Sequence, residues 1–216
     1  MEKKEAIELI KKAKESSNKR KFNQRVDLII NLKNLDLKKA EQQVDLFLTL
    51  PKGKGKKTTI CALVGPELIE DAKKDMDFAI IQDDFDKYKD KKLARRLAQK
   101  YDFFVAQANI MPKVAGAFGR VLGVRGKMPN PKSGCVVPPK ANMKTVHSNL
   151  QSVVRVSAKT SPMIQVAIGT ESMSDEDLAE NFLAVYNAVL HALPQERNNL
   201  RRMTLKTTMG KPIVVM

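Results

Sequence analysis

The hydrophobic pattern changes twice along the chain, and these changes restrict its possible folds more than any other feature. Up to residue 50, the apolar positions have the spacing of one amphipathic helix, 3–16, and of two strands with one buried face, Val26–Leu32 and Val44–Leu50. From Thr58, short apolar runs alternate with helical stretches, which is typical of a parallel sheet covered by helices. After Val154, the pattern of the first part returns.

The middle of the chain predicts a doubly wound α/β domain. Its short apolar runs are expected to form four strands: Thr58–Val64, Phe78–Ile81, Phe103–Ala106 and Val136–Val137. Its helical stretches are Glu67–Lys74, Leu93–Tyr101, Val114–Leu122 and Met143–Leu150. Because strands and helices alternate, successive strands are expected to lie parallel and to be joined by helical crossovers.

The last part of the chain predicts one strand, one helix and then a hairpin. Met163–Ile168 is the strand, and a helix that runs to Leu190 follows it. Ser174 with Asp177 three residues later is an N-terminal capping signal for that helix. The hairpin strands are Leu200–Thr208 and Pro212–Val215.

The two flanks share one pattern, so we expect them to form a single domain although they are separate in sequence. The predicted fold class is therefore α/β with two domains. A discontinuous two-layer α+β domain is made from residues 1–59 and 156–216, and a Rossmann-like α/β domain, residues 60–155, is inserted into it. The connecting segments, Pro51–Thr58 and Arg155–Lys159, are expected to form a hinge.

The formal net charge of +15 favours an anionic partner. The charge is uneven, because Phe103–Thr170 contains nine basic residues and no Asp or Glu. The nine are Lys113, Arg120, Arg125, Lys127, Lys132, Lys140, Lys144, Arg155 and Lys159. An ordinary solvated surface carries acids as well, so this stretch indicates that something anionic approaches it.

Composition excludes several protein classes. An apolar fraction of 43% is too high for a disordered chain, and no apolar run is long enough to form a membrane-spanning helix. Cys61 and Cys135 are too few for a disulfide framework or a four-ligand zinc site. The charged start, Met1–Glu5, lacks the pattern of a signal peptide. We therefore expect a cytoplasmic protein that does not bind membranes.

Enzyme signatures are poor. The chain has no G-x-G-x-x-G, Walker, H-E-x-x-H or C-x-x-C motif, so no catalytic residue, metal or cofactor is predicted. The alternative of a nucleotide-dependent α/β enzyme needs a phosphate loop after the first strand of the middle domain. Val64–Glu67 stands there and supplies one glycine and an acid. A DNA-binding regulator is a third interpretation, and no helix-turn-helix with a basic recognition helix supports it.

The strand predicted over Leu200–Thr208 is a candidate RNA-binding surface. Period-two spacing places two cations and two hydroxyls on one face: Arg202, Thr204, Lys206 and Thr208. Such a face suits contacts with phosphates and 2′-hydroxyls. In the turn that follows, Gly210 permits close backbone approach and Met209 is an apolar tip that can pack on a base. An ordinary hairpin with a solvated face explains this pattern equally well.

A basic cluster near the N-terminus surrounds one aromatic residue. Its members are Lys19, Arg20, Lys21, Phe22 and Arg25. Phe22 either belongs to the core or contacts a nucleotide, and the local pattern favours the core.

Three segments together resemble the ribosomal protein L-one family of the large subunit. One segment, which follows Arg125, resembles the signature of that family: Gly126, Lys127, Met128, Pro129, Asn130, Pro131 and Lys132. Thr207–Gly210 is similar to the RNA-contacting turn of that family, and Lys21 and Phe22, followed by Asp27, match its N-terminal pattern. The resemblance covers essentially the whole chain, and its ending is similar to archaeal members.

The resemblance implies a protein that is not an enzyme and that is a monomer off the ribosome. The discontinuous domain is expected to bind large-subunit rRNA at the mobile stalk beside the E site, among other ribosomal components. The protein is expected to accompany release of deacylated tRNA from the E site. Many members of the family also bind the leader of their own mRNA and repress its translation.

The resemblance also assigns RNA contacts to individual positions. Those that match by position are Lys21, Phe22, Asp27, Thr208, Met209 and Gly210. Arg25 and Arg202 stand where bacterial relatives usually carry small hydroxyl residues, and both differences favour phosphate binding; Lys159 and Lys206 are further basic candidates. The segment Arg125–Lys132 either packs within the inserted domain or contacts RNA or tRNA, and the sequence does not separate these roles.

Overall fold

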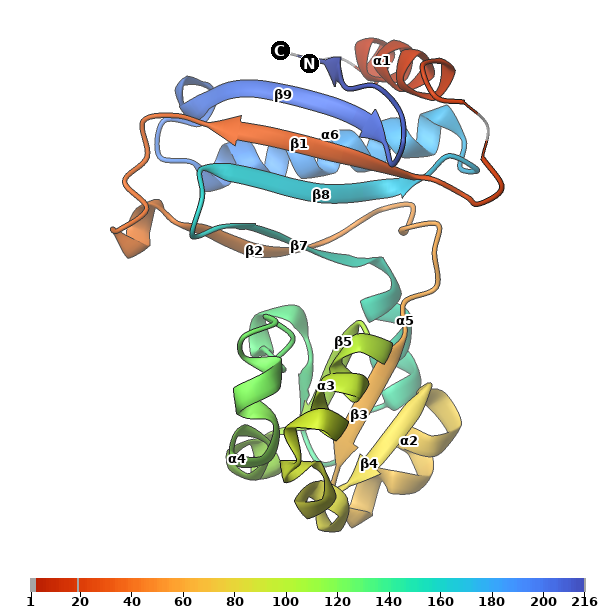
Figure 1. Cartoon of the computed structure of the whole chain (residues 1–216), viewed down its shortest axis with the longest axis vertical. Helices are drawn as coiled ribbons and strands as arrows, with labels where there is room; N and C mark the ends of the chain where they lie inside the picture. Colours follow the sequence, from red (N-terminus) through yellow and green to blue (C-terminus); the bar gives the residue numbers. More distant parts are fainter. Residues whose placement is uncertain (1–2, 19, 216) are drawn as a thin grey trace. The chain divides into compact units, whose positions relative to one another are not determined.

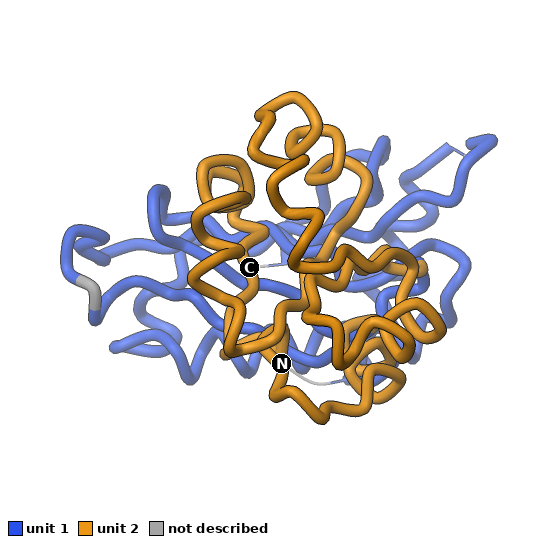
Figure 2. The backbone as a smooth tube through the Cα atoms, turned by 90° about the horizontal axis from the view of Figure 1, so that it is seen from below, with its two compact units in different colours: residues 1–56, 152–216 blue, residues 57–151 orange. Residues whose placement is uncertain are grey.

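The computed structural model describes residues 3–18 and 20–215, which divide into two compact units (Figure 2). Unit 1 comprises Met1–Lys56 and Ser152–Met216, and unit 2 comprises Lys57–Gln151. Both units combine helices with sheets, which confirms the predicted α/β class. Each unit has its own cluster of buried apolar side chains.

The secondary structure follows the predicted order. Unit 1 contains α1 (Lys3–Glu15), β1 (Arg25–Leu32), η1 (Ala40–Gln42), β2 (Val44–Thr49), β7 (Val153–Ala158), β8 (Met163–Thr170), α6 (Asp175–Ala192), η6 (Glu196–Asn199), β9 (Leu200–Thr207) and β10 (Ile213–Val214). Unit 2 contains β3 (Ile60–Val64), η2 (Pro66–Leu68), α2 (Ile69–Asp75), β4 (Phe78–Ile81), η3 (Gln82–Lys89), α3 (Lys91–Lys100), β5 (Phe103–Gln107), η4 (Ala108–Ile110), α4 (Met111–Leu122), η5 (Pro131–Ser133), β6 (Val136–Val137) and α5, which runs from Met143 to Ser152. Strand β7 and the six short η segments, which are 3-10 helices, were not predicted.

Unit 1 is built on a four-stranded antiparallel sheet with the order β10-β9-β1-β8 (Figure 1). In the centre of the sheet, Leu28 of β1 lies opposite Val166 of β8 and Leu205 of β9. Because side chains alternate along a strand, this register directs all three to the same face.

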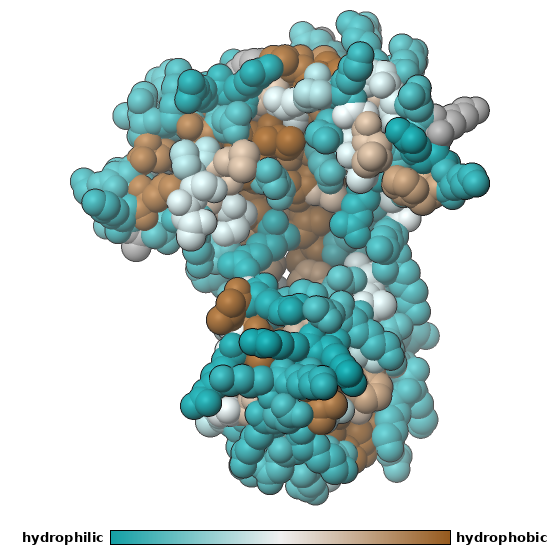
Figure 3. Space-filling view, viewed as in Figure 1, coloured by the Kyte–Doolittle hydropathy of each residue, from teal (hydrophilic) through white to brown (hydrophobic). Residues whose placement is uncertain are grey.

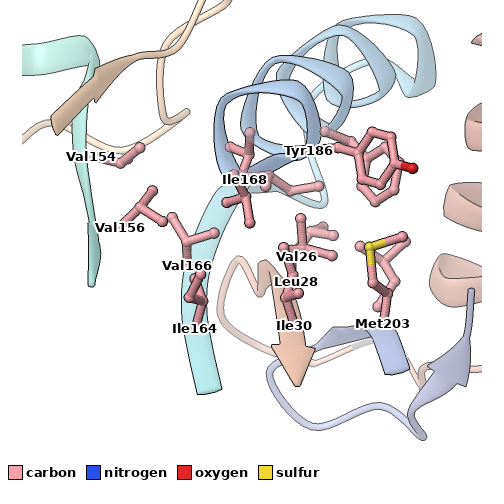
Figure 4. Close-up of a cluster of buried hydrophobic side chains, with 14 of the residues drawn as sticks. Val26, Leu28, Ile30, Val154, Val156, Ile164, Val166, Ile168, Tyr186 and Met203 are labelled. Atoms are coloured by element: carbon pink, nitrogen blue, oxygen red, sulfur yellow. The ribbon is translucent and has the colours of Figure 1, made fainter. Parts of the chain in front are cut away.

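Helices α1 and α6 cover that apolar face. Figure 4 shows the side chains of Val26, Leu28 and Ile30 directed, with those of neighbouring strands, toward Tyr186 of α6. The predicted cap of α6 is confirmed, since Ser174 Oγ accepts a hydrogen bond from Asp177 N at 3.1 Å. Among the described helices of unit 1, both long ones lie on this side of the sheet, so its other face is open to a partner.

A separate two-stranded ladder joins β2 to β7. The chain enters unit 1 at Ser152, which is earlier than the predicted second connecting segment, Arg155–Lys159. Residues 153–158 belong to strand β7 of unit 1. Arg155 lies in the middle of the strand, and its Nε donates to Asp45 Oδ1 at 3.0 Å. Strand β7 forms because Val154, Val156 and Ala158 alternate into the core.

Unit 2 contains a parallel sheet with the order β4-β3-β5-β6. All five residues of the inner strand β3 are buried, as expected for a parallel strand between helical layers. All four predicted strands and all four predicted helices of this segment are confirmed, with η3 added between β4 and α3.

In the described part of the chain, no helix is long and apolar enough to cross a membrane. Across the same residues, no group of three His, Cys, Asp or Glu side chains is arranged to hold a metal ion.

Candidate nucleic-acid interface

The open face of the unit 1 sheet carries polar side chains from β1 and β9. On β1, Arg25 is exposed and Asp27 is half-buried, and both alternate with core residues. Asp27 lies opposite Lys206, and Asn31 lies opposite Arg202. Figure 3, drawn from the side on which the strands pass in front of α6, shows hydrophilic residues interspersed with apolar ones over unit 1. This face therefore offers cations, a carboxylate and apolar surface together.

The predicted face of β9 differs from expectation at two positions. Thr204 is only 8% exposed, because it lies between Ile29 and Val214 in the register of the sheet. Strand β9 ends at Thr207, so Thr208 belongs to the turn rather than to the strand face. Of the four predicted positions, Arg202 and Lys206 remain as accessible groups of the strand.

The turn after β9 is held against the start of β1. Thr208 N donates to Arg25 O at 3.0 Å, and Thr208 Oγ1 accepts from Arg25 N at 3.0 Å. Met209 stands at the tip with 60% of its surface exposed. Gly210 is required here, because a Cβ at this position would collide with Thr207 Oγ1 and press on Ser17.

The buried side chain of Gln24 binds this turn by a hydrogen bond, and no sequence pattern indicated this role. Its side chain is fully buried, and its Oε1 accepts from Met209 N at 3.1 Å. Its Nε2 lies 2.9 Å from Ser17 Oγ, 3.2 Å from Asn18 O and 3.1 Å from Glu171 Oε2. One amide thus joins three loops, and the position of the Met209 tip depends on it.

Phe22 is 52% exposed, so the interpretation that placed it in the core is wrong. No neighbouring position supplies the period that would bury it, and Lys21 beside it is also exposed. Lys19, a member of the predicted basic cluster, lies outside the described residues. We define the turn-end surface as five residues at this end of the sheet: Lys21, Phe22, Arg25, Thr208 and Met209.

Other predicted residues lie at the opposite end of the strands. Arg202 lines a hollow of about 420 Å³ whose remaining lining is Asn31, Leu32, Pro162, Met163 and Arg201. Asn31 lies six positions along β1 from Arg25, about 20 Å at the rise of a strand. Lys159 Nζ is paired with Asp45 Oδ2 at 2.7 Å. The structure therefore brings together the turn residues but not Arg202 or Lys159 with them.

Burial raises the pKa of Asp27, and the nearby charges of Arg25 and Lys206 offset this only in part. A carboxyl that binds its proton more tightly in the folded state loses its stabilising contribution as the pH rises through its folded pKa. Asp27→Asn is therefore expected to raise the free energy of unfolding at pH 7. At a pH well below 3.8, the ordinary pKa of an aspartate, the substitution is expected to give no gain in stability. Hydrogen exchange of β1 amides as a function of pH measures this.

Asp45→Asn is the matched control with the opposite sign. Burial raises the pKa of Asp45, but hydrogen bonds and charge from Lys159 and Arg155 lower it further than burial raises it. The contribution of Asp45 to stability is fully present above its unfolded pKa and is lost as the pH falls through its folded pKa. Asp45→Asn is therefore expected to destabilise unit 1 at pH 7. The same sign for both variants would contradict this assignment.

The segment Arg125–Lys132 packs within unit 2 through its central residues. Lys127 Nζ donates to Ala98 O at 2.9 Å and to Tyr101 O at 2.7 Å, which satisfies carbonyls at the end of α3. Asn130 Oδ1 accepts from Lys132 N at 2.9 Å. Gly126 has a φ of 64°, Met128 packs against the core and Pro129 is buried. Arg125, Pro131 and Lys132 are exposed, so these are the most accessible side chains of the segment.

Lys127→Ala is expected to destabilise unit 2 by about 1–2 kcal/mol, because two carbonyls at the end of α3 lose their shared donor. Burial lowers the pKa of Lys127, and the charge of Asp102 opposes this only in part while that of Arg125 adds to it. Hydrogen exchange of α3 amides measures the loss. Lys132→Ala, at an exposed site, is the control; equal effects of the two substitutions would argue against a packing role for Lys127.

The loop after β3 does not form a phosphate cradle. This is where a Rossmann-like sheet would bind a nucleotide. Gly65 N already donates to Oε1 of the buried Gln107 at 2.9 Å, and Gln107 Nε2 lies 3.5 Å from Glu67 Oε2. The N–H of Gly65 is therefore not free to donate to a phosphate, and the carboxylate of Glu67 would repel one. Both features argue against the alternative of a nucleotide-dependent enzyme.

Comparison with known proteins gives a consistent result along the chain. The model of the Ribosomal protein L1p/L10e family matches residues 10–211. The chain is 42% identical over 215 residues to the large ribosomal subunit protein uL1 of Nanoarchaeum equitans, with 98% of this chain and 99% of the relative covered. For the proteins of the same name from Methanobrevibacter smithii and Thermococcus kodakarensis, the identities are 42% and 39%, with 97% of this chain and 97% and 95% of the relatives covered.

Proposed function

The chain belongs to the Ribosomal protein L1p/L10e family, and from this premise we propose that it is a component of the large ribosomal subunit that binds rRNA through the turn-end surface of unit 1. The observation that carries this assignment is an exposed apolar and cationic turn held in place by a fully buried amide. Its place of action is then the ribosome in the cytoplasm, and its role is recognition of RNA rather than catalysis.

The turn-end surface and the adjoining residues Asp27 and Lys206 of the open sheet face each have a distinct part in binding. Lys21, Arg25 and Lys206 supply salt-dependent affinity for phosphates. Phe22 and Met209, both more than half exposed, offer apolar surface on which unpaired bases can pack. Asp27 adds an acceptor for a 2′-hydroxyl or an exocyclic amine of a base. Recognition therefore combines charge with the shape of folded RNA.

The finer function that we propose has three parts. The protein forms the mobile stalk beside the E site and accompanies release of deacylated tRNA. The exposed residues Arg125, Pro131 and Lys132 of unit 2 face tRNA. Off the ribosome the protein is a monomer that binds the leader of its own mRNA through the turn-end surface and represses translation.

A competition titration at several salt concentrations tests the proposed function. We expect a folded large-subunit rRNA fragment containing the stalk to displace a labelled copy of itself, whereas duplex DNA displaces it only at low salt. Equal displacement by both competitors at 150 mM salt would leave only general polyanion affinity and would overturn specific rRNA recognition.

A further inference from the structure

Helices α3 and α4 lie side by side in unit 2 (Figure 1). Two adjoining cavities of about 220 and 250 Å³ share Lys91, Arg120 and Val121 in their linings. Arg95 and Arg125 complete the wall at one end. We refer to the two cavities together as the α3–α4 groove.

The groove is positively charged, and most of its cations have no acidic partner within the described residues. No acidic residue lines either cavity. Two acids of η3 pair with lysines of the same segment: Asp84 with Lys87 at 2.6 Å and Asp86 with Lys89 at 2.7 Å. The side chain of Asp90 accepts from Lys92 N at the start of α3. Five cations line the two cavities: Lys89 pairs with Asp86, whereas the other four form no ion pair within the described residues. These four are Lys91, Arg95, Arg120 and Arg125.

The floor of the groove is small and apolar. Ala94, Gly116 and Ala117 line it, and a Cβ added to Gly116 would meet nothing within 4 Å. Val124 stands at the edge with 89% of its surface exposed. A shallow apolar floor between cationic walls suits a chain of sugars and phosphates, since ribose packs on the floor while arginine forks bind phosphate oxygens.

We propose that the α3–α4 groove binds the phosphodiester backbone of RNA, as a site separate from the turn-end surface. The choice of RNA as the polyanion rests on the proposed function, and the site itself rests on the geometry and charge of the groove. Three arginines favour a phosphate backbone, because each can bind phosphate oxygens in a bidentate manner. The groove also explains part of the acid-free stretch, because α4 lies within it.

The test compares matched charge reversals in the full-length chain. Arg95→Glu changes a groove residue, and Arg96→Glu makes the same change on the next, exposed position of α3, which lines neither cavity. The probe is a 20-base-pair RNA duplex of arbitrary sequence, titrated between 50 and 200 mM salt. Arg95→Glu is expected to weaken binding at least about fivefold and to reduce the slope of log K against log salt by about 1, with Arg96→Glu below about twofold.

A second pair of substitutions consists of one that blocks the groove without removing a cation and one that serves as its control. Gly116→Glu places a carboxylate over the floor, whereas Gly119→Glu places one in open space on the same helix outside both linings. Only Gly116→Glu is expected to weaken RNA binding, and circular dichroism checks that both variants fold. Equal losses within both pairs would overturn the groove as a site.

Loss of poly-glutamate binding in the groove variants with unchanged RNA binding would also overturn the proposal, in favour of an acidic protein partner. Either negative result leaves the turn-end surface untouched, because that surface is tested with the rRNA fragment and with substitutions in unit 1. Failure of the groove and failure of the proposed function are therefore distinguishable.

Discussion

Gln24→Glu is expected to lower the free energy of unfolding of unit 1 by about 2–4 kcal/mol at pH 7. The substitution keeps the shape of a fully buried side chain but replaces its donor by a carboxylate. That carboxylate would face Asn18 O and Glu171 Oε2, both of which lie near Nε2 in the native chain. Repulsion and burial of charge then act together.

The same substitution is expected to weaken binding of the rRNA fragment at least about fivefold, because the Met209 tip loses its fixed position. Hydrogen exchange of β1 amides gives the stability, and filter binding gives the affinity. Lowering the pH protonates the new carboxyl and is expected to restore part of the stability. Exposed Gln99→Glu is the control for a change of charge without burial.

A compensating change separates the role of Gln24 from general damage. In Gln24→Glu/Glu171→Gln, the amide and the carboxylate exchange places, so a donor again faces an acceptor between these two positions. The double variant is expected to recover at least about 1 kcal/mol and part of the RNA affinity. Additive losses from the two substitutions would show that this pair does not hold the turn.

Met209→Asp is expected to weaken specific rRNA binding at least about tenfold, or about 1.4 kcal/mol, without destabilising the fold. The side chain is 60% exposed in the free protein, so the new carboxylate is solvated there and is opposed only when RNA phosphates approach. The salt dependence of the loss is informative, because repulsion between charges weakens as salt screens them.

Met163→Asp is the matched control for this prediction. Met163 is 36% exposed on the same sheet face, but it lies opposite Asn31 at the far end of β1. We expect a smaller loss of affinity from this variant. Equal losses would extend the interface over the whole face, and unchanged affinity in Met209→Asp would remove the turn from the site.

Regular periodicity is what made much of the fold predictable. The alternation along β1 and the apolar runs of β3 and β5 leave few other structures, because burial of a whole face depends on register. Strand β7 was missed because it begins directly after α5, with no turn residue to mark its start.

The candidate site was less predictable because its decisive residues have no period. For Phe22 the local pattern favoured the core over a nucleotide contact, whereas the family resemblance implied an RNA contact. Its exposure depends on the path of the loop before β1, which has no period. Gln24 was missed because a single glutamine acquires its role only when three distant loops meet around it. The sequence does not separate packing from RNA contact for Lys127. Its packing role becomes visible only in the fold, where its Nζ donates to two carbonyls at the end of α3.

The central claim is that unit 1 alone carries specific recognition of rRNA. Unit 1 has a complete core cluster made only from its own residues, and buried Asn181 holds the outgoing chain through Lys52 N and Gly53 O. The direct measurement is the affinity for the rRNA fragment of a chain in which residues 57–151 are replaced by a Gly-Ser linker. We expect a Kd within about threefold of that of the full chain, because residues remote from a site contribute little to it. A folded deletion variant whose affinity falls at least about tenfold, to the level of Met209→Asp, would contradict the account.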